Sequence, residues 1–226
     1  MKKMSNILEY FLILTSVLFV FGCFATSYRT AKTQEPKQFA IGAGYMHLEN
    51  LENSEADGID LLNVDLRYGI AKGFDAGLAH TFDITSNNGS SLSTVWGDFK
   101  VQLSNTDNEI GKPIFSLGLI KGYVYDPEVH MTSLPLMLSL PVNEQLTPTL
   151  QYCFTLTSSD FVPTEFEDPR HEFSLGLEYS FTKPSSDNWT PKVGFAVGTF
   201  NSLTGGEGDQ GLLLNFGFTL ESPTNY

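Results

Sequence analysis

The sequence is poor in charge, in cysteine and in long apolar runs, and each shortage narrows the range of folds. Charged residues make up 17% of the 226 residues, whereas soluble domains usually carry about 25%. After residue 22 no apolar run reaches the roughly 18 residues that a membrane-spanning helix needs. The main part of the chain is therefore less charged than a soluble domain, yet it offers no spanning helix.

Cysteine and basic charge are too scarce for several functional classes. Cys23 and Cys153 are the only cysteines, so no disulfide framework or cysteine metal cluster can be built. The net charge of −13 argues against nucleic-acid binding, which needs a basic surface. We expect neither a cofactor nor a metal site.

What the sequence has instead is alternation, most clearly between Gly58 and Asp83. Apolar and polar residues alternate through GIDLLNVDLRYGI and again through FDAGLAHTFD, with a tight turn at Ala71-Lys72-Gly73. Successive side chains of a strand point to opposite faces, so each half has one apolar and one polar face. The stretch predicts a β-hairpin.

The same alternation of apolar and polar residues predicts strands along the rest of the chain, with turn-forming residues between them. The expected strands outside the hairpin are Gln38–Leu48, Leu92–Leu103, Pro113–Tyr125, Met131–Leu140, Gln145–Leu156, His171–Phe181, Thr190–Phe200 and Gly211–Leu220. With the hairpin they make ten strands of roughly ten residues, which is the length of a tilted membrane strand. The expected fold is an all-β, antiparallel, up-and-down transmembrane barrel.

Three features favour lipid over a soluble core on the apolar side. Aromatic residues such as Tyr68 and Tyr179 lie near strand ends, as in the interfacial girdles of membrane barrels. Odd-numbered connections hold most of the acidic loop residues and include the longest, whereas even-numbered ones include the tightest turns. Charged residues recur on the polar faces, where a lumen can pair them. The architectural alternative is a soluble lipocalin-like barrel on a lipid tether.

Region 38–220 as a whole resembles small bacterial outer-membrane β-barrels. The hairpin LRYGIAKGFDAGL looks like the turn pattern of such proteins, and DQGLLLNF at Asp209–Phe216 resembles their C-terminal insertion signal. The resemblance implies outer-membrane lipids and the barrel-insertion machinery as partners. It also implies that both chain ends are periplasmic and that the odd connections are extracellular.

The first residues have the composition of an export signal. Lys2 and Lys3 precede an apolar stretch that ends in Gly22-Cys23. The Gly-Cys ending resembles the lipobox of bacterial lipoproteins, which implies lipidation of Cys23. Cleavage after Ala25 or an uncleaved anchor helix are the alternatives. The expected organisation is a signal peptide (1–22), a lipidated linker (23–37), a barrel (38–221) and a short tail (222–226).

The candidate site is a network of charged side chains in the lumen. The residues assigned to it are Asp65, Arg67, Asp98, Lys100 and Glu178. Unpaired buried charge is costly, so these ions are expected to neutralise one another and fill the lumen. Small inward residues such as Gly77 and Gly176 keep a narrow wet passage possible.

No catalytic residue is assigned, and we expect no enzyme. His80 with Asp83 and Ser86, or His171 with Glu172, are the best candidates for a lipid-acting site, but no local motif marks them. A divalent cation at the acidic loops is a further hypothesis. The sequence thus favours a structural or interaction role for a barrel with acidic extracellular loops. The alternatives are a narrow pore or small-solute and lipid transport barrel, and a lipid-modifying barrel enzyme; the oligomeric state is open.

Overall fold

The protein is a closed antiparallel β-barrel in the computed structural model, which describes residues 30–50, 58–85, 93–125, 128–160, 167–183, 187–202 and 210–224. Its strands are β1 (Phe39–Asn50), β2 (Ile59–Ala71), β3 (Phe74–Asp83), β4 (Thr94–Gln102), β5 (Ile114–Val124), β6 (Val129–Ser139), β7 (Leu146–Ser158), β8 (Glu167–Ser180), β9 (Thr190–Ser202) and β10 (Gln210–Glu221). None of the described segments forms a helix that is long and apolar enough to span a bilayer.

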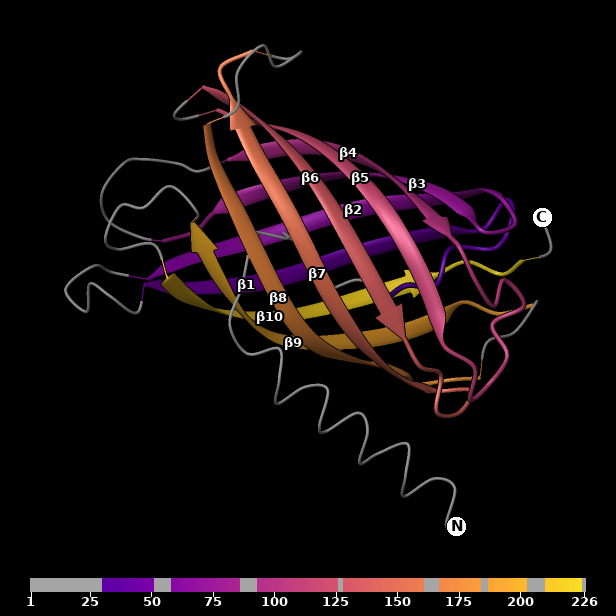
Figure 1. The fold of residues 1–226 in the computed structure, drawn as a ribbon. Coiled ribbons are helices and arrows are strands. Elements are labelled where there is room, and N and C mark those ends of the chain that lie inside the picture. Colours follow the sequence, from indigo (N-terminus) through magenta and orange to yellow (C-terminus); the bar gives the residue numbers. More distant parts are fainter. Residues whose placement is uncertain are drawn as a thin grey trace.

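The connectivity is up-and-down, as the sequence predicted. Each strand pairs with its neighbours in the chain, and β1 pairs with β10 to close the barrel (Figure 1). All ten predicted strands are present, and the hairpin of β2 and β3 turns at Lys72 and Gly73. The predicted fold class is confirmed.

Strand lengths differ from the prediction mainly around the seventh connection. β8 begins at Glu167 rather than at His171, so the connection from β7 shortens to residues 159–166. The fourth connection, 103–113, is longer than that. The two sets of connections therefore differ less in length than the sequence predicted. The sequence pattern underestimates the length of a strand that continues beyond the apolar band, because the alternation ends with that band.

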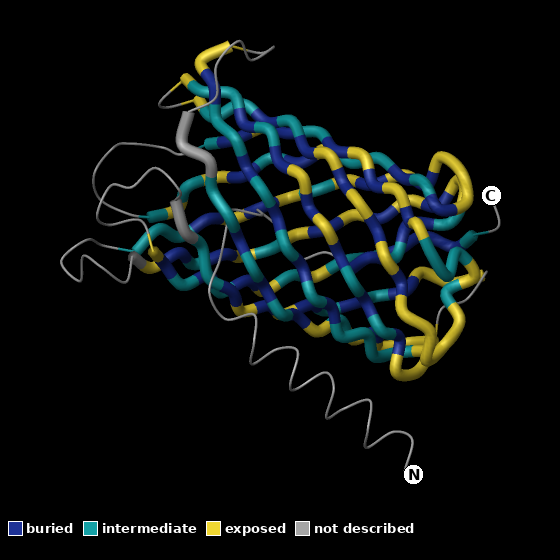
Figure 2. Tube along the Cα trace, viewed as in Figure 1, coloured by how far each residue is buried: buried dark blue, intermediate teal, exposed yellow. Residues whose placement is uncertain are grey.

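The two faces of the wall have the polarity that the alternation indicated. In β2, Leu62, Val64 and Leu66 are exposed on the outer face, whereas Asn63 and Arg67 are buried inside. Buried and exposed residues alternate in this way along most strands (Figure 2). The barrel is thus apolar outside and predominantly polar within, the reverse of a soluble protein.

The two rims of the barrel differ in what they carry. One rim holds the turn between β2 and β3, the other even-numbered connections, the end of β10 and the segment that precedes β1. We call residues 30–38 the strap and this rim the strap-side rim; the opposite rim is the far rim. Gln38 joins the two chain segments here, because its amide donates to the Ser222 carbonyl at 2.9 Å.

Candidate functional site: the filled lumen

An ionic cluster occupies the lumen beside β2, β3 and β4. Arg67 of β2 donates to Asp75 of β3 and to Asp98 of β4, and all three side chains are at least nine-tenths buried. Lys100 Nζ lies 3.6 Å from Asp75 Oδ2. Gly77 makes room for the cluster, because a Cβ there would lie 2.6 Å from Asp98 Oδ2. The cluster thus pairs two cations with two carboxylates.

A second cluster lies on the other side of the lumen. Lys192 of β9 donates to Glu178 of β8 at 3.1 Å and to Glu221 of β10 at 2.7 Å. The Lys192 side chain is 4% exposed, so its charge depends on these two carboxylates. The three residues come from neighbouring strands and occupy inward-facing positions, so their side chains meet in the lumen.

The strap closes the space between the two clusters. Lys100 Nζ donates to the carbonyl oxygens of Thr30, at 3.1 Å, and Lys32, at 2.5 Å. The backbone N–H of Gln34 donates to Asp75 Oδ2 at 2.8 Å, and its side-chain amide donates to Glu221 Oε1 at 3.2 Å. Gln34 therefore bridges the first cluster to the second.

Further strap contacts reach the wall on the other strands. Gln102 of β4 accepts from both the backbone N–H and the hydroxyl of Thr33, at 3.0 and 2.9 Å. The N–H of Ala31 donates to Ser139 Oγ at 2.8 Å, and Ala31 itself is fully buried against Ile114 and Met137. The strap thus crosses the lumen from β1 to β6.

Farther from the strap the lumen is filled by hydroxyls and then by apolar side chains. Trp96 Nε1 donates to Thr81 Oγ1 at 3.3 Å, and Ser133 and Thr155 share a 2.7 Å hydrogen bond. Toward the far rim, two apolar clusters line the inside, one of Met46, Leu48, Leu61 and Leu213 and one of Ala79, Trp96 and Ile120. The sequence had predicted a polar face throughout, so these apolar inner residues are a correction.

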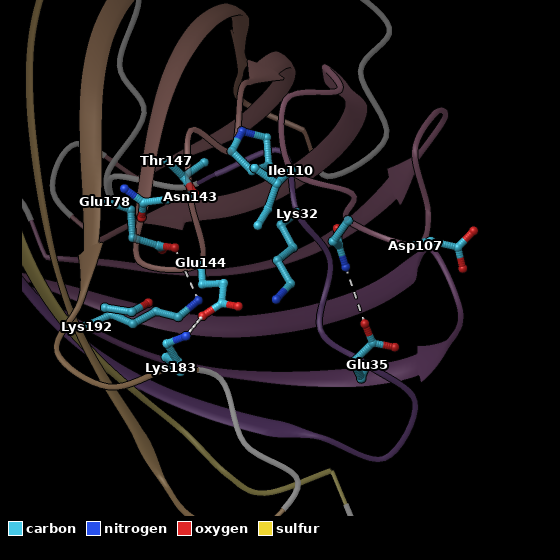
Figure 3. A pocket seen from close by; sticks show the side chains of 13 residues that line it. Lys32, Glu35, Asp107, Ile110, Asn143, Glu144, Thr147, Glu178, Lys183 and Lys192 are labelled. Atoms are coloured by element: carbon cyan, nitrogen blue, oxygen red, sulfur yellow. Dashed lines mark hydrogen bonds and ion pairs between the residues drawn. The ribbon is translucent and has the colours of Figure 1, made fainter.

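The cavities among the described lumen residues are small and polar. Two small polar cavities of about 50 and 20 Å³ lie in the lumen, the larger between the strap, Asp65, Arg67 and Glu178. A wider pocket of about 420 Å³ opens at the strap-side rim (Figure 3). The strap supplies Lys32 and Glu35 to it, while Lys183 pairs with Glu144 at 2.5 Å on its outer edge. Water can enter this mouth but meets the strap.

The five predicted lumen residues all face inward, and the structure places them in or beside the two clusters. Arg67, Asp98 and Lys100 belong to the first cluster, in which Lys100 contacts Asp75 and the strap. Glu178 belongs to the second cluster. Asp65 lines the larger cavity and accepts a long 3.5 Å hydrogen bond from Asn63.

Several residues of the site were not singled out from the sequence. Asp75 lies on the predicted polar face of the hairpin and is fully buried, so the parity rule could have found it. Lys192 and Glu221 needed the same rule applied to the last two strands. The position of the strap carries no sequence signal, because its polar residues fit a linker equally well. Cys23 lies outside the described residues.

The two candidate catalytic groupings are split by the barrel wall. His80 and His171 face outward, whereas Asp83 and Glu172 have the opposite, inward parity on their strands. His80 instead has Ser93 Oγ at 3.5 Å, and His171 has the Tyr152 hydroxyl at 2.5 Å. Ser86 lies outside the described residues. Among the described residues no group of three His, Cys, Asp or Glu side chains could hold a metal ion.

No protein-family model matches the chain, and no curated protein matches its sequence. Among solved structures, it is similar to the N-terminal β-barrel domain of OprF from Pseudomonas aeruginosa, at 10% identity and TM-score 0.33 over 83% of this chain and 99% of that one. It is also similar to Neisserial surface protein A, at 9% identity and TM-score 0.35 over 81% and 96% of the two chains. The Escherichia coli outer membrane protease OmpT gives 10% identity and TM-score 0.35 over 85% and 98%. At these values the similarities carry no argument about function.

Proposed function

We propose that the protein is a bacterial outer-membrane β-barrel whose lumen is sealed and whose role is structural or interactive. Membrane insertion is supported by the apolar outer wall, where Ile41, Leu78, Phe99 and Phe195 are each about half exposed or more. Such a continuous apolar surface is unfavourable in water and matches the lipid-facing band of membrane barrels. The proposal includes no reaction.

The proposed orientation places the strap-side rim in the periplasm. It carries both the segment before β1 and the end of β10, and periplasmic termini leave the acidic odd-numbered connections outside. Residues 23 and 30 are seven positions apart, a reach of at most about 25 Å. A lipid on Cys23 can therefore insert in the periplasmic leaflet while Thr30 stays in the lumen.

One observation carries the sealed lumen: Gln34 of the strap bridges the two buried ionic clusters. The first cluster holds two cations and two carboxylates, the second holds Lys192 between two carboxylates, and the strap occupies the space between them. An ion that crosses the barrel must break buried charge pairs, which costs several kcal/mol each. The resting protein should therefore not conduct.

Planar-bilayer recording of the purified protein tests the seal. We expect no steady single-channel steps from the natural protein, and steps from a Thr33→Ala/Gln34→Ala variant that loses the strap's side-chain hydrogen bonds to Gln102 and Glu221. Steady steps from the natural protein would contradict the seal. Membrane location is tested separately by carbonate washing and by gel mobility with and without boiling.

The second candidate is a narrow pore that the strap gates. One observation favours it: most of the strap is held by side-chain contacts rather than by strand pairing. The strap also lines the 420 Å³ pocket at the strap-side rim. A gated pore predicts brief, voltage-dependent openings of the natural protein. A permanent seal predicts none under the same voltages.

A further inference from the structure

The pocket at the strap-side rim is large enough to hold a small solute. Its volume is about 420 Å³, which lies in the range of small-molecule sites. It is lined mainly by the strap, by the connections 103–113 and 140–145, and by the inner face of β7, β8 and β9. Lys32 and Glu178 line both this pocket and the 50 Å³ cavity in the lumen. The hydrogen-bonding groups of the lining therefore decide which solute fits.

The carboxylates of the lining are already held by donors. Four of them line the pocket, and each accepts a hydrogen bond or an ion pair from another side chain. The pairs are Glu144 with Lys183 at 2.5 Å, Glu178 with Lys192 at 3.1 Å, Asp107 with Lys72 at 2.5 Å and Glu35 with the Asn108 amide at 3.3 Å. A ligand therefore need not supply donors to these carboxylates.

The Lys32 ammonium is in a different position. Its half-buried side chain extends from the strap into the pocket (Figure 3), and no hydrogen bond or ion pair joins its Nζ to another of the described residues. Its backbone is fixed, because Lys100 donates to the Lys32 carbonyl oxygen. The Lys32 charge also attracts Glu221. That carboxylate already accepts hydrogen bonds from Lys192 and Gln34, so the ammonium is available to an anion that enters the pocket.

Uncharged donors lie around the same space. Thr147 of β7 and Ser180 of β8 occupy inward positions and contribute hydroxyls to the lining. Asn143 accepts the N–H groups of Gln145 and Leu146 through its Oδ1, at 2.8 and 2.9 Å, so its NH₂ group remains as a donor. One ammonium and several neutral donors match the acceptor oxygens of an oxyanion.

We propose that this pocket binds a small organic acid with a single carboxylate. Lys32 forms the charge-assisted hydrogen bond, and Ser180 and Thr147 donate to the remaining lone pairs. Ile110 and Pro141, which also line the pocket, contact the carbon chain of the acid. In the proposed orientation the ligand comes from the periplasm, but binding itself requires neither the membrane nor the seal.

The carboxylates of the lining select for a ligand with one charge. A doubly charged anion at Lys32 would bring its second charge toward Glu144 and Glu178, which line the same pocket. Like charges brought together in a site are destabilising and exclude the wrong ligand. Inorganic phosphate, which is partly divalent at neutral pH, should therefore bind less well than a monocarboxylate.

The test is isothermal titration of the purified protein in neutral detergent at low salt. Lactate, lactamide and inorganic phosphate serve as probes, because lactamide has the size of lactate without its charge. We expect one lactate per chain with a dissociation constant of about 1 mM, as for a small ligand with few contacts. Lactamide should bind at least about tenfold more weakly.

Variants of the strap assign the binding to Lys32. Lys32→Gln should weaken lactate binding about tenfold, whereas Lys32→Arg should keep most of it. Ser180→Ala removes a neutral donor and should weaken binding by about fivefold. The matched control is Lys37→Gln, because Lys37 is an exposed lysine of the same strap outside the pocket lining. This control should bind lactate as the natural protein does.

The inference is wrong if folded Lys32→Gln, checked by gel mobility with and without boiling, binds lactate as the natural protein does. Equal binding of lactate and lactamide by the natural protein overturns it without any variant, so a misfolded variant does not protect it. Tighter binding of phosphate than of lactate overturns the proposed ligand class. None of these outcomes depends on the bilayer recordings or on carbonate washing, which test the seal and the membrane location separately.

Discussion

The two halves of the lumen are lined by the same alternate strand positions, yet they are filled in opposite ways. Behind the strap, Arg67, Asp75 and Lys192 lie in ionic clusters. Toward the far rim, Leu61 and Leu213 pack against one another with Met46 and Leu48. An ionic filling depends on each partner being present, because a lone buried charge is costly, whereas an apolar filling depends on volume.

The largest expected effect is the loss of Arg67. Arg67→Leu removes the cation that pairs with both Asp75 and Asp98. We expect the free energy of unfolding to fall by about 3–5 kcal/mol, measured by urea titration in detergent with gel mobility as the readout. The double variant Arg67→Leu/Asp98→Leu should recover part of the loss. A double variant as unstable as the sum of the singles would contradict direct pairing.

A smaller loss is expected in the apolar half. Leu213 is 1% exposed, so Leu213→Ala should lower the free energy of unfolding by about 2–4 kcal/mol through the cavity it creates. Leu213→Met keeps the volume and should cost less than about 1.5 kcal/mol. In the ionic half the equivalent conservative change, Arg67→Lys, loses one of two forked contacts. If Arg67→Lys lowers the free energy of unfolding less than Leu213→Met does, the contrast between the ionic and the apolar half of the lumen is wrong.

The strap can be displaced by one methyl group. At Gly69 a Cβ would lie 1.9 Å from the Glu35 carbonyl oxygen, so Gly69→Ala must push the strap away from β2. Overpacking of this kind costs about 1–3 kcal/mol, and the sharper readout is bilayer conductance, which we expect to appear. Gly217→Ala is the control, since the nearest neighbour of its Cβ would be 3.8 Å away. If Gly217→Ala conducts as much as Gly69→Ala does, the strap is not the seal.

Alternation was enough to predict the barrel because every strand obeys it over most of its length. Leu62, Val64 and Leu66 are exposed and Asn63 and Arg67 are buried, as the period of two requires. The same rule placed Glu178 and Lys100 inside. It could not choose their partners, since partners depend on which strands are neighbours across the lumen and on side-chain reach.

Two features had no local signal. The strap is polar and aperiodic, and its place in the lumen follows from contacts with distant residues such as Gln102 and Glu221. The apolar inner residues near the far rim, such as Met46 and Leu213, share the parity of polar ones. A pattern that assigns apolar residues to one face of each strand and polar residues to the other cannot predict that the inner face becomes apolar toward the far rim.

The smallest effect is expected outside the lumen, at the exposed pair of Lys72 and Asp107. Their side chains are 2.5 Å apart across two connections of the strap-side rim. The hydrogen bond from Lys72 lowers the pKa of Asp107, and the same bond raises the pKa of Lys72. The stabilisation is therefore present above the usual aspartate pKa of about 3.9 and is lost as the pH falls through the lower folded value.

At the alkaline end it is lost as the pH rises through the raised pKa of Lys72. Lys72→Gln should thus unfold slightly earlier in urea than the natural protein at pH 7, and the difference should vanish at low pH and in high salt because the pair is exposed to solvent. Unlike Arg67→Leu, this variant leaves no buried charge behind. A difference as large as that of Arg67→Leu, or one that persists in 1 M salt, would mean that burial is not what separates the lumen pairs from those at the rim.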